Sequence, residues 1–153
     1  MRTPLMVILL TSALGCGGPA SPAVGATGVV GPIVVSHAVA WGLPAAASLT
    51  VGLHLTHDGA EPDTLEGGRV GDQEFMLHDV VGGRMVMLDL LEVAPGAKVV
   101  LGTGGVHLMA EGVPPAVWEA GEVEVTLRFR RAGALALRVP VVNYSEAMRE
   151  LRR

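Results

Sequence analysis

Apolar and polar residues alternate along most of the chain from Pro32 onward. Between residues 48 and 56, leucine or valine occupies every second position, with threonine, glycine or histidine between. A period of two places alternate side chains on opposite faces of a β-strand, so this segment predicts a strand with one buried face. Similar segments separated by glycine- and proline-rich turns predict about nine strands: 33–41, 48–56, 64–70, 73–80, 84–93, 98–104, 106–113, 123–130 and 134–142.

Many short strands at close spacing are typical of an all-β sandwich or barrel. The weakest predicted strand, 64–70, is expected at a sheet edge, and residues 114–122 are expected to form a loop. The tail 145–153 differs, because Ser145 can cap a helix and arginines follow near its C-terminal end. With 153 residues, the chain is expected to form one β domain with a short C-terminal helix.

The N-terminal residues 1–15 are expected to be a signal peptide, because Arg2 is followed by a short apolar run and small residues. The run is too short for an ordinary membrane span. The only cysteine, Cys16, follows Ala-Leu-Gly and resembles the lipidated first residue of bacterial lipoproteins. Residues 16–31 then predict a lipidated cysteine and flexible tether, 32–142 the β domain and 143–153 the helical tail. Cleavage elsewhere, giving a soluble secreted protein, is the alternative.

Composition and motifs exclude several classes of function. The formal net charge is −4, and lysine and arginine do not cluster with interleaved aromatic residues, which argues against nucleic-acid binding. The chain has no G-x-S-x-G and no H-E-x-x-H motif, and no lysine or predicted helix follows Gly-Thr-Gly-Gly at 102–105. A lipidated Cys16 cannot act as a nucleophile. We therefore expect a protein that is not an enzyme.

Histidine and methionine recur on three of the predicted strands. Each time two such residues are separated by one position, so the period of two places both on one face. Thioether and imidazole donors together suit Cu(I), whereas Mg²⁺ and Ca²⁺ prefer oxygen and structural zinc usually binds cysteine and histidine. Core packing is the commoner role of methionine and is the alternative. The pairs are Met76 with His78, Met85 with Met87, and His107 with Met109.

The segment from about 47 to 141 resembles the periplasmic copper chaperones of the PCuAC type. The family pattern is a histidine, a downstream methionine, 21 residues, and then His-x-Met. Here His78 opens the pattern, 21 residues separate Met85 from His107, and Gly-Gly-Val-His-Leu-Met matches the final stretch closely. The preceding turn and strand, Ala-Pro-Gly-Ala-Lys-Val-Val-Leu, are also similar.

The resemblance implies a cupredoxin-like Greek-key barrel that binds one Cu(I) and delivers it to cytochrome oxidase assembly. It implies that the copper ligands are His78, Met85, His107 and Met109. Six residues separate His78 from Met85, where the family has ten, so residues 79–84 are expected to form a shortened hairpin. Met87 lies on the same predicted face as Met85 and replaces it if the strand register differs.

A copper carrier on the periplasmic side of the envelope is therefore the leading hypothesis. Gly17, rather than aspartate, follows the cysteine, so an outer-membrane anchor is expected in preference to an inner-membrane one. The second hypothesis is a metal-free structural or interaction lipoprotein on the same scaffold, which the shortened hairpin favours. A blue-copper site would need a cysteine thiolate. The remaining residues have structural expectations. Met76 is expected in packing, and His37, His54 and His57 on the surface or in loops. Trp41 and Trp118 are expected in the core or as plugs at a barrel end.

Overall fold

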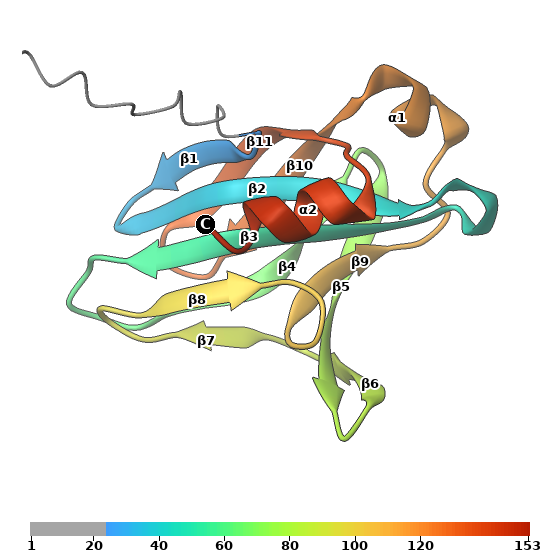
Figure 1. Ribbon diagram of the computed structural model, residues 1–153. Coiled ribbons are helices and arrows are strands. Elements are labelled where there is room, and N and C mark those ends of the chain that lie inside the picture. The colour runs from blue at the N-terminus through green and yellow to red at the C-terminus, as the bar shows by residue number, and fades with distance from the viewer. Residues whose placement is uncertain (1–23) are drawn as a thin grey trace, which may run out of the picture.

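The computed structural model describes residues 24–153, so the predicted signal peptide and Cys16 lie outside the described residues. Eleven strands form one nearly closed antiparallel barrel (Figure 1), which confirms the expected all-β barrel. The main strand order is β1-β2-β3-β9-β5-β4-β10-β11, with β6 on β5, β7 on β4 and β8 on β3. The strands are β1 Ala26–Val30, β2 Ile33–Leu43, β3 Ser48–His57, β4 Asp63–Val70, β5 Gln73–Val81, β6 Arg84–Leu88, β7 Leu91–Val93, β8 Lys98–Leu101, β9 His107–Ala110, β10 Glu122–Phe129 and β11 Gly133–Pro140.

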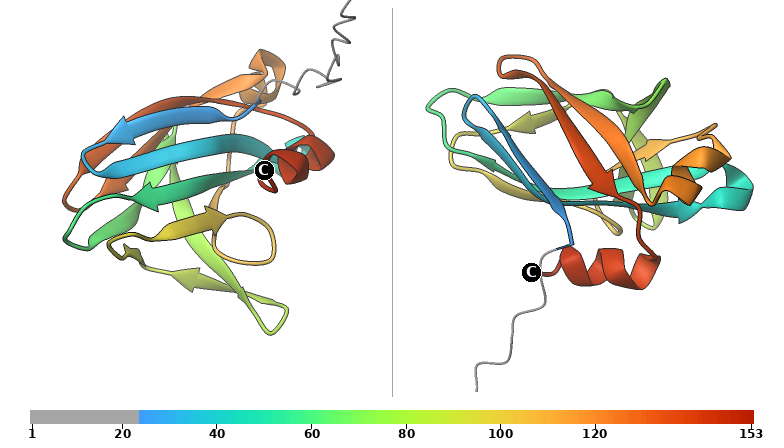
Figure 2. Two further views of the ribbon diagram at one scale, coloured as in Figure 1. Left: turned by 60° about the vertical axis from the view of Figure 1, so that its left-hand side comes forward. Right: turned by 90° about the horizontal axis from the view of Figure 1, so that it is seen from above.

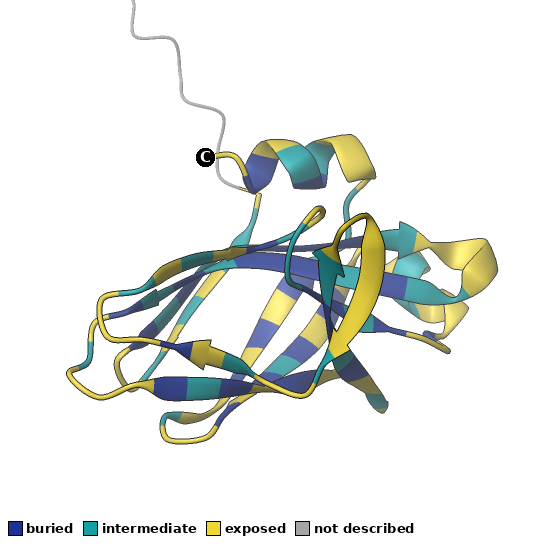
Figure 3. Ribbon diagram, turned by 90° about the horizontal axis from the view of Figure 1, so that it is seen from below, coloured by how far each residue is buried: buried dark blue, intermediate teal, exposed yellow. Residues whose placement is uncertain are grey.

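The barrel interior is filled by the apolar set of the alternating strands. The leucines and valines at every second position of β3 are fully buried, as the sequence pattern predicted. Figure 3 shows buried residues alternating with exposed ones along the barrel strands. A second, smaller cluster outside the barrel contains Val39, Trp41, Ala147 and Leu151. Both clusters draw on residues between Ala26 and Leu151, so residues 24–153 contain both clusters and can be studied as a folded domain.

The C-terminal helix is confirmed and lies outside the barrel (Figure 2). This helix, α2 (Tyr144–Glu150), begins at Asn143 rather than at Ser145. The Asn143 side chain accepts a hydrogen bond from the backbone of Glu146, and the Glu146 carboxylate accepts one from the backbone of Asn143, which together form a capping box. Ala147 is buried against β2 on the face of the helix that meets the barrel. Among residues 24–153, no helix has the length and apolar character needed to cross a membrane.

The expectation that 64–70 is an edge strand was wrong, because β4 lies between β5 and β10. Its two glycines, which weakened the sequence pattern, are required for this central position. Gly67 has a φ of +115°, and a Cβ on Gly68 would lie 2.2 Å from the Thr126 carbonyl oxygen of β10. The glycines therefore allow close approach of the neighbouring backbone.

The segment 84–93 was expected to form one strand but forms two. β6 pairs with β5, and β7 pairs with β4, with the exposed Asp89 and Leu90 between them. Apolar residues continue on both sides of Asp89, so the sequence does not show that the two halves join different strands. The split leaves β6 at a corner of the barrel with β5 as its single partner among the described strands.

Two further expectations were wrong. Residues 114–122 contain a helix, α1 (Pro115–Ala120), in place of a loop, because its proline occupies the first turn and Gly121, with a φ of +71°, ends it. Residues 26–30, which were expected to belong to a flexible tether over 16–31, form the strand β1, which pairs with β2. Gly28 in β1 packs so closely on β11 that an added Cβ would lie 2.5 Å from Leu137.

Candidate metal centre

Three neighbouring strands bring the histidine–methionine pairs together at one corner of the barrel. β5 lies between β9 and β6. Directly opposed residues share a face of the sheet, with Cβ atoms about 5 Å apart. The opposed pairs are His78 with His107, His78 with Met87, Met76 with Met109, and Val80 with Met85. One face therefore gathers two histidines and four methionines.

A tight turn sets the register of the hairpin that supplies Met85 and Met87. Val81 and Arg84 are opposed, which leaves Gly82 and Gly83 as the two-residue turn. Their φ angles are +59° and +77°, the combination that a type I′ hairpin needs. The short hairpin expected from the sequence is therefore present. Its register places Met87 directly opposite His78, whereas Met85, the methionine selected by spacing, lies two residue pairs farther along, opposite Val80.

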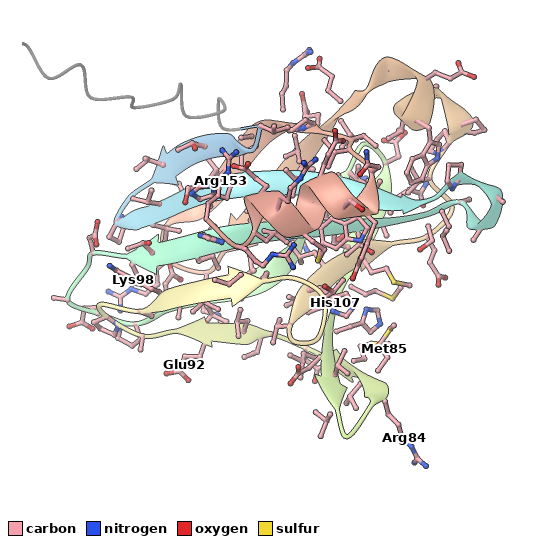
Figure 4. All side chains as sticks on the ribbon, viewed as in Figure 1. Arg84, Met85, Glu92, Lys98, His107 and Arg153 are labelled. Atoms are coloured by element: carbon pink, nitrogen blue, oxygen red, sulfur yellow. The ribbon has the colours of Figure 1, made fainter. Side chains whose placement is uncertain are left out.

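The histidines and the hairpin methionines differ sharply in exposure. His78 and His107 are 8% and 6% exposed, whereas Met85 and Met87 are 57% and 63% exposed. Figure 4 shows Met85 and His107 at the same corner of the molecule, where the β5–β6 hairpin projects from the barrel. Core packing, the alternative role for Met85 and Met87, is excluded by this exposure. Met76 and Met109 are half-buried.

Hydrogen bonding leaves a ring nitrogen of each buried histidine free to bind a metal. His107 Nδ1 lies 2.9 Å from the carbonyl oxygen of Gly105. A carbonyl can only accept, so His107 Nδ1 carries the proton and Nε2 keeps its lone pair when the ring is neutral. The adjacent Gly104 has a φ of +89°, which confirms the turn expected at these glycines. The two glycines before His107 therefore set the turn that orients its ring.

His78 has a buried, unpartnered nitrogen. Its Nδ1 has no hydrogen-bond partner, although buried polar atoms are nearly always paired. Burial lowers the pKa of His78, the neighbouring His107 lowers it further, and Glu111 opposes the shift. The ring centroids of His78 and His107 are 5.8 Å apart. The pair therefore presents adjacent imidazole rings, and the neutral form that binds metals is favoured at His78.

The donor atoms at this corner are chemically soft. Within residues 24–153, no group of three or more histidine, cysteine, aspartate or glutamate side chains is arranged to hold a metal ion. The side-chain donors that β9, β5 and β6 bring to one face are two imidazoles and four thioethers. Such a set suits Cu(I) and provides none of the carboxylate oxygens that Mg²⁺ and Ca²⁺ need. The unpartnered nitrogen of His78 also fits a bound metal.

The other histidines lie elsewhere and have structural contacts. His37 Nδ1 lies 2.8 Å from Glu150 Oε1, and His54 Nε2 lies 3.0 Å from the carbonyl oxygen of Leu151, so both hold the C-terminal helix against the barrel. His57 is fully buried, which corrects its expected surface or loop position. It is the last residue of β3, and the following loop folds over its ring, with Gly59 donating to its Nδ1 at 2.9 Å.

Comparison with known proteins assigns the family. The family model described as "Putative lipoprotein LpqE-like" matches residues 32–141. The chain belongs to the LpqE-like family. No curated protein matches the sequence.

Solved structures with the same fold include three structures of two PCuAC domains. A copper-bound PCuAC domain from PmoF2 has a TM-score of 0.66 and 20% identity, covering 76% of this chain and 97% of that domain. The apo form of the PmoF2 domain has a TM-score of 0.61 and 20% identity over 77% of this chain and 94% of its own. The apo PCuAC domain from PmoF1 has a TM-score of 0.63 and 18% identity, covering 76% of this chain and 98% of that domain. These matches show that this LpqE-like chain has the fold of PCuAC domains.

Proposed function

We propose that this protein is a copper chaperone that binds Cu(I) as cargo on the extracytoplasmic side of the cell envelope. The observation that supports this best is the juxtaposition of two buried histidines and four methionines on one face of β9, β5 and β6. The donors match the preference of Cu(I) for soft ligands. The same fold occurs in a copper-bound PCuAC domain.

Four ligands would hold the ion. His107 binds through Nε2, because its Nδ1 donates to Gly105. His78 offers the adjacent imidazole, and Met109 is the β9 thioether. The fourth donor comes from the hairpin and is Met85 by the spacing of the family pattern, or Met87 by its position opposite His78. Neutral thioethers lose little to proton competition, so the methionines remain donors in mildly acidic surroundings.

The unequal burial of the ligands favours transfer over permanent storage. The two histidines are enclosed, whereas the hairpin methionines are more than half exposed. A partner's thiolate or thioether can therefore displace a hairpin methionine first, while the histidines still hold the ion. This ligand exchange needs no general acid, base or nucleophile, so the protein acts as a carrier and not as an enzyme.

The location and acceptor complete the proposal. The LpqE-like family is described as a lipoprotein family, which agrees with a signal peptide over residues 1–15 and acylation of Cys16. The anchor then holds the domain on the periplasmic side, in the outer membrane in preference to the inner one. By resemblance to PCuAC chaperones, the acceptor is a cytochrome oxidase subunit or another protein of its copper assembly.

A competition titration tests the copper proposal. Residues 24–153 are titrated with Cu(I) against a chromophoric chelator under reducing, anaerobic conditions. We expect one tight equivalent, weakened at least about tenfold in His78→Gln and in His107→Gln, since loss of a ligand removes a bond the remaining donors do not replace. Met148→Leu removes a thioether of α2 that lies outside the strands β9, β5 and β6, and as the matched control it should bind like the unmodified domain.

The alternative is an interaction lipoprotein that uses no metal. The apolar, exposed hairpin favours it, because Val81 and Val86 are each at least 44% exposed, and such surface often contacts a partner. This function predicts a folded domain that leaves all the Cu(I) with the competitor.

A further inference from the structure

A groove lies between α2 and the loop that joins β8 to β9, on the outer face of the barrel. It encloses about 670 Å³, which is within the range of small-ligand sites. Val100, Met148 and Leu151 provide an apolar lining, and Val100 is 53% exposed. The polar lining consists of the hydroxyl groups of Thr103, Tyr144 and Ser145 and the guanidinium groups of Arg149 and Arg152.

The two arginines of this groove have no carboxylate partner among residues 24–153. Six other arginines in this part of the chain form ion pairs with glutamates, namely Arg69, Arg128, Arg130, Arg131, Arg138 and Arg153. The chain as a whole is acidic, with a formal net charge of −4. The two arginines therefore place unpaired positive charge beside the apolar lining of the groove, an arrangement complementary to a ligand with an anionic end and a hydrocarbon part.

The chain enters the fold beside this helix. The backbone N–H of Val24 donates to Glu150 Oε2 at 3.4 Å, and Glu150 is next to Arg149 in sequence. Seven residues separate Cys16 from Val24, so the Cα atoms of these two residues lie at most about 28 Å apart when the segment is fully extended. An acyl anchor at Cys16 would therefore keep α2 and its groove close to the lipid surface.

We propose that the groove binds an anionic phospholipid. Arg149 and Arg152 bind the headgroup phosphate, for which the guanidinium group is well suited. Val100 and Met148 contact the start of the acyl chain. The preference for a membrane lipid over a soluble phosphate rests on the anchor in the proposed function, but nothing in the groove depends on copper.

The test follows backbone amide signals of residues 24–153 by NMR during titration with dihexanoylphosphatidylglycerol below its micelle concentration. We expect saturable shifts at Thr103, Ser145 and Met148. The double variant Arg149→Gln/Arg152→Gln should bind at least about tenfold more weakly, since each arginine near a phosphate adds a favourable charge contact. Arg128→Gln/Arg130→Gln removes the same charge from β10 and should change the affinity less than about twofold.

Three outcomes would overturn the proposal. Unchanged affinity in Arg149→Gln/Arg152→Gln excludes the groove, and an equal loss in the β10 control shows that net charge alone is responsible. Inorganic phosphate that saturates the same signals with the same affinity identifies a free oxyanion as the ligand.

Val100→Gln keeps the charge and is expected to weaken lipid binding several-fold. Cu(I) binding by these variants should stay unchanged, so failure of the groove is distinguishable from failure of the copper site.

Discussion

His78 and His107 lie directly opposite one another on β5 and β9, with their ring centroids 5.8 Å apart and both side chains buried. Met87 lies opposite His78 on its other side and is mostly exposed. Ordinary packing gives the reverse arrangement, in which methionine is buried and histidine is at the surface. The reversal places soft, displaceable donors outside and imidazoles inside, as a carrier of a soft metal requires.

Met85 and Met87 should act as exchangeable donors, because both project from one face of β6 and both are exposed. We predict that Met85→Leu and Met87→Leu each weaken Cu(I) binding less than about threefold, whereas the double variant weakens it at least about tenfold. Leucine preserves the apolar volume, so folding is little affected. Competition titration measures all three affinities. A full loss in either single variant would identify that residue as the sole hairpin ligand and refute exchange.

The glycine turn should control copper affinity through strand register. Gly82 and Gly83 both have positive φ, and a Cβ on either would meet no atom within 4 Å. Substitution there therefore costs backbone strain alone, about 1–2 kcal/mol for an ordinary residue. We predict that Gly82→Asn, which tolerates positive φ, keeps the wild-type Cu(I) affinity, and that Gly82→Val weakens it. Equal affinities in the two variants would show that the turn does not position the hairpin methionines.

The alternating pattern predicted most of the barrel because the strands that it describes bury one face. Glycine and proline were harder to interpret, since each can either end a regular element or be required within one. Pro115 and Gly121 bound a short helix, and Gly68 permits close pairing in a central strand. Their role depends on what the neighbouring backbone does, which the local sequence does not contain.

The sequence predicts which residues form the candidate centre but not how they are arranged. The period of two places His107 with Met109, and the structure confirms that these residues share a face with His78. The period of two does not show which residues of different strands are opposed. The position of Met87 opposite His78 and of Met76 opposite Met109 depends on the register between strands. That register follows from a turn and from long-range pairing, neither of which alternation reveals.

Asp63 should stabilise the barrel in a pH-dependent way. Its carboxylate accepts hydrogen bonds from the backbone N–H groups of Thr64, Arg131 and Ala132 at 2.7–2.8 Å. Burial alone would raise the pKa of Asp63, but these hydrogen bonds and the nearby His57 lower it on balance. Because the folded-state pKa lies below the unfolded one, near 3.9, the stabilisation is present above that value and is lost as the pH falls through the folded pKa.

Asp63→Asn should therefore destabilise the domain by about 1–3 kcal/mol at pH 7, since an amide nitrogen cannot accept the bond that Ala132 donates. Urea unfolding of residues 24–153 at pH 7 and pH 3 measures the difference from the unmodified domain. We expect the difference to shrink at the lower pH as the aspartate begins to take up its proton. A difference that is constant with pH would show that the charge of Asp63 has no part in its stabilising role.

X-ray absorption spectroscopy of the copper-loaded domain tests the central claim most directly. The account predicts one Cu(I) bound by both imidazole nitrogen and sulfur, with the sulfur signal lost in a variant whose Met76, Met85, Met87 and Met109 are replaced by leucine. Because Cys16 precedes residue 24, sulfur bound to copper in residues 24–153 must come from methionine. A copper site with nitrogen and oxygen neighbours alone would contradict the thioether site on β9, β5 and β6.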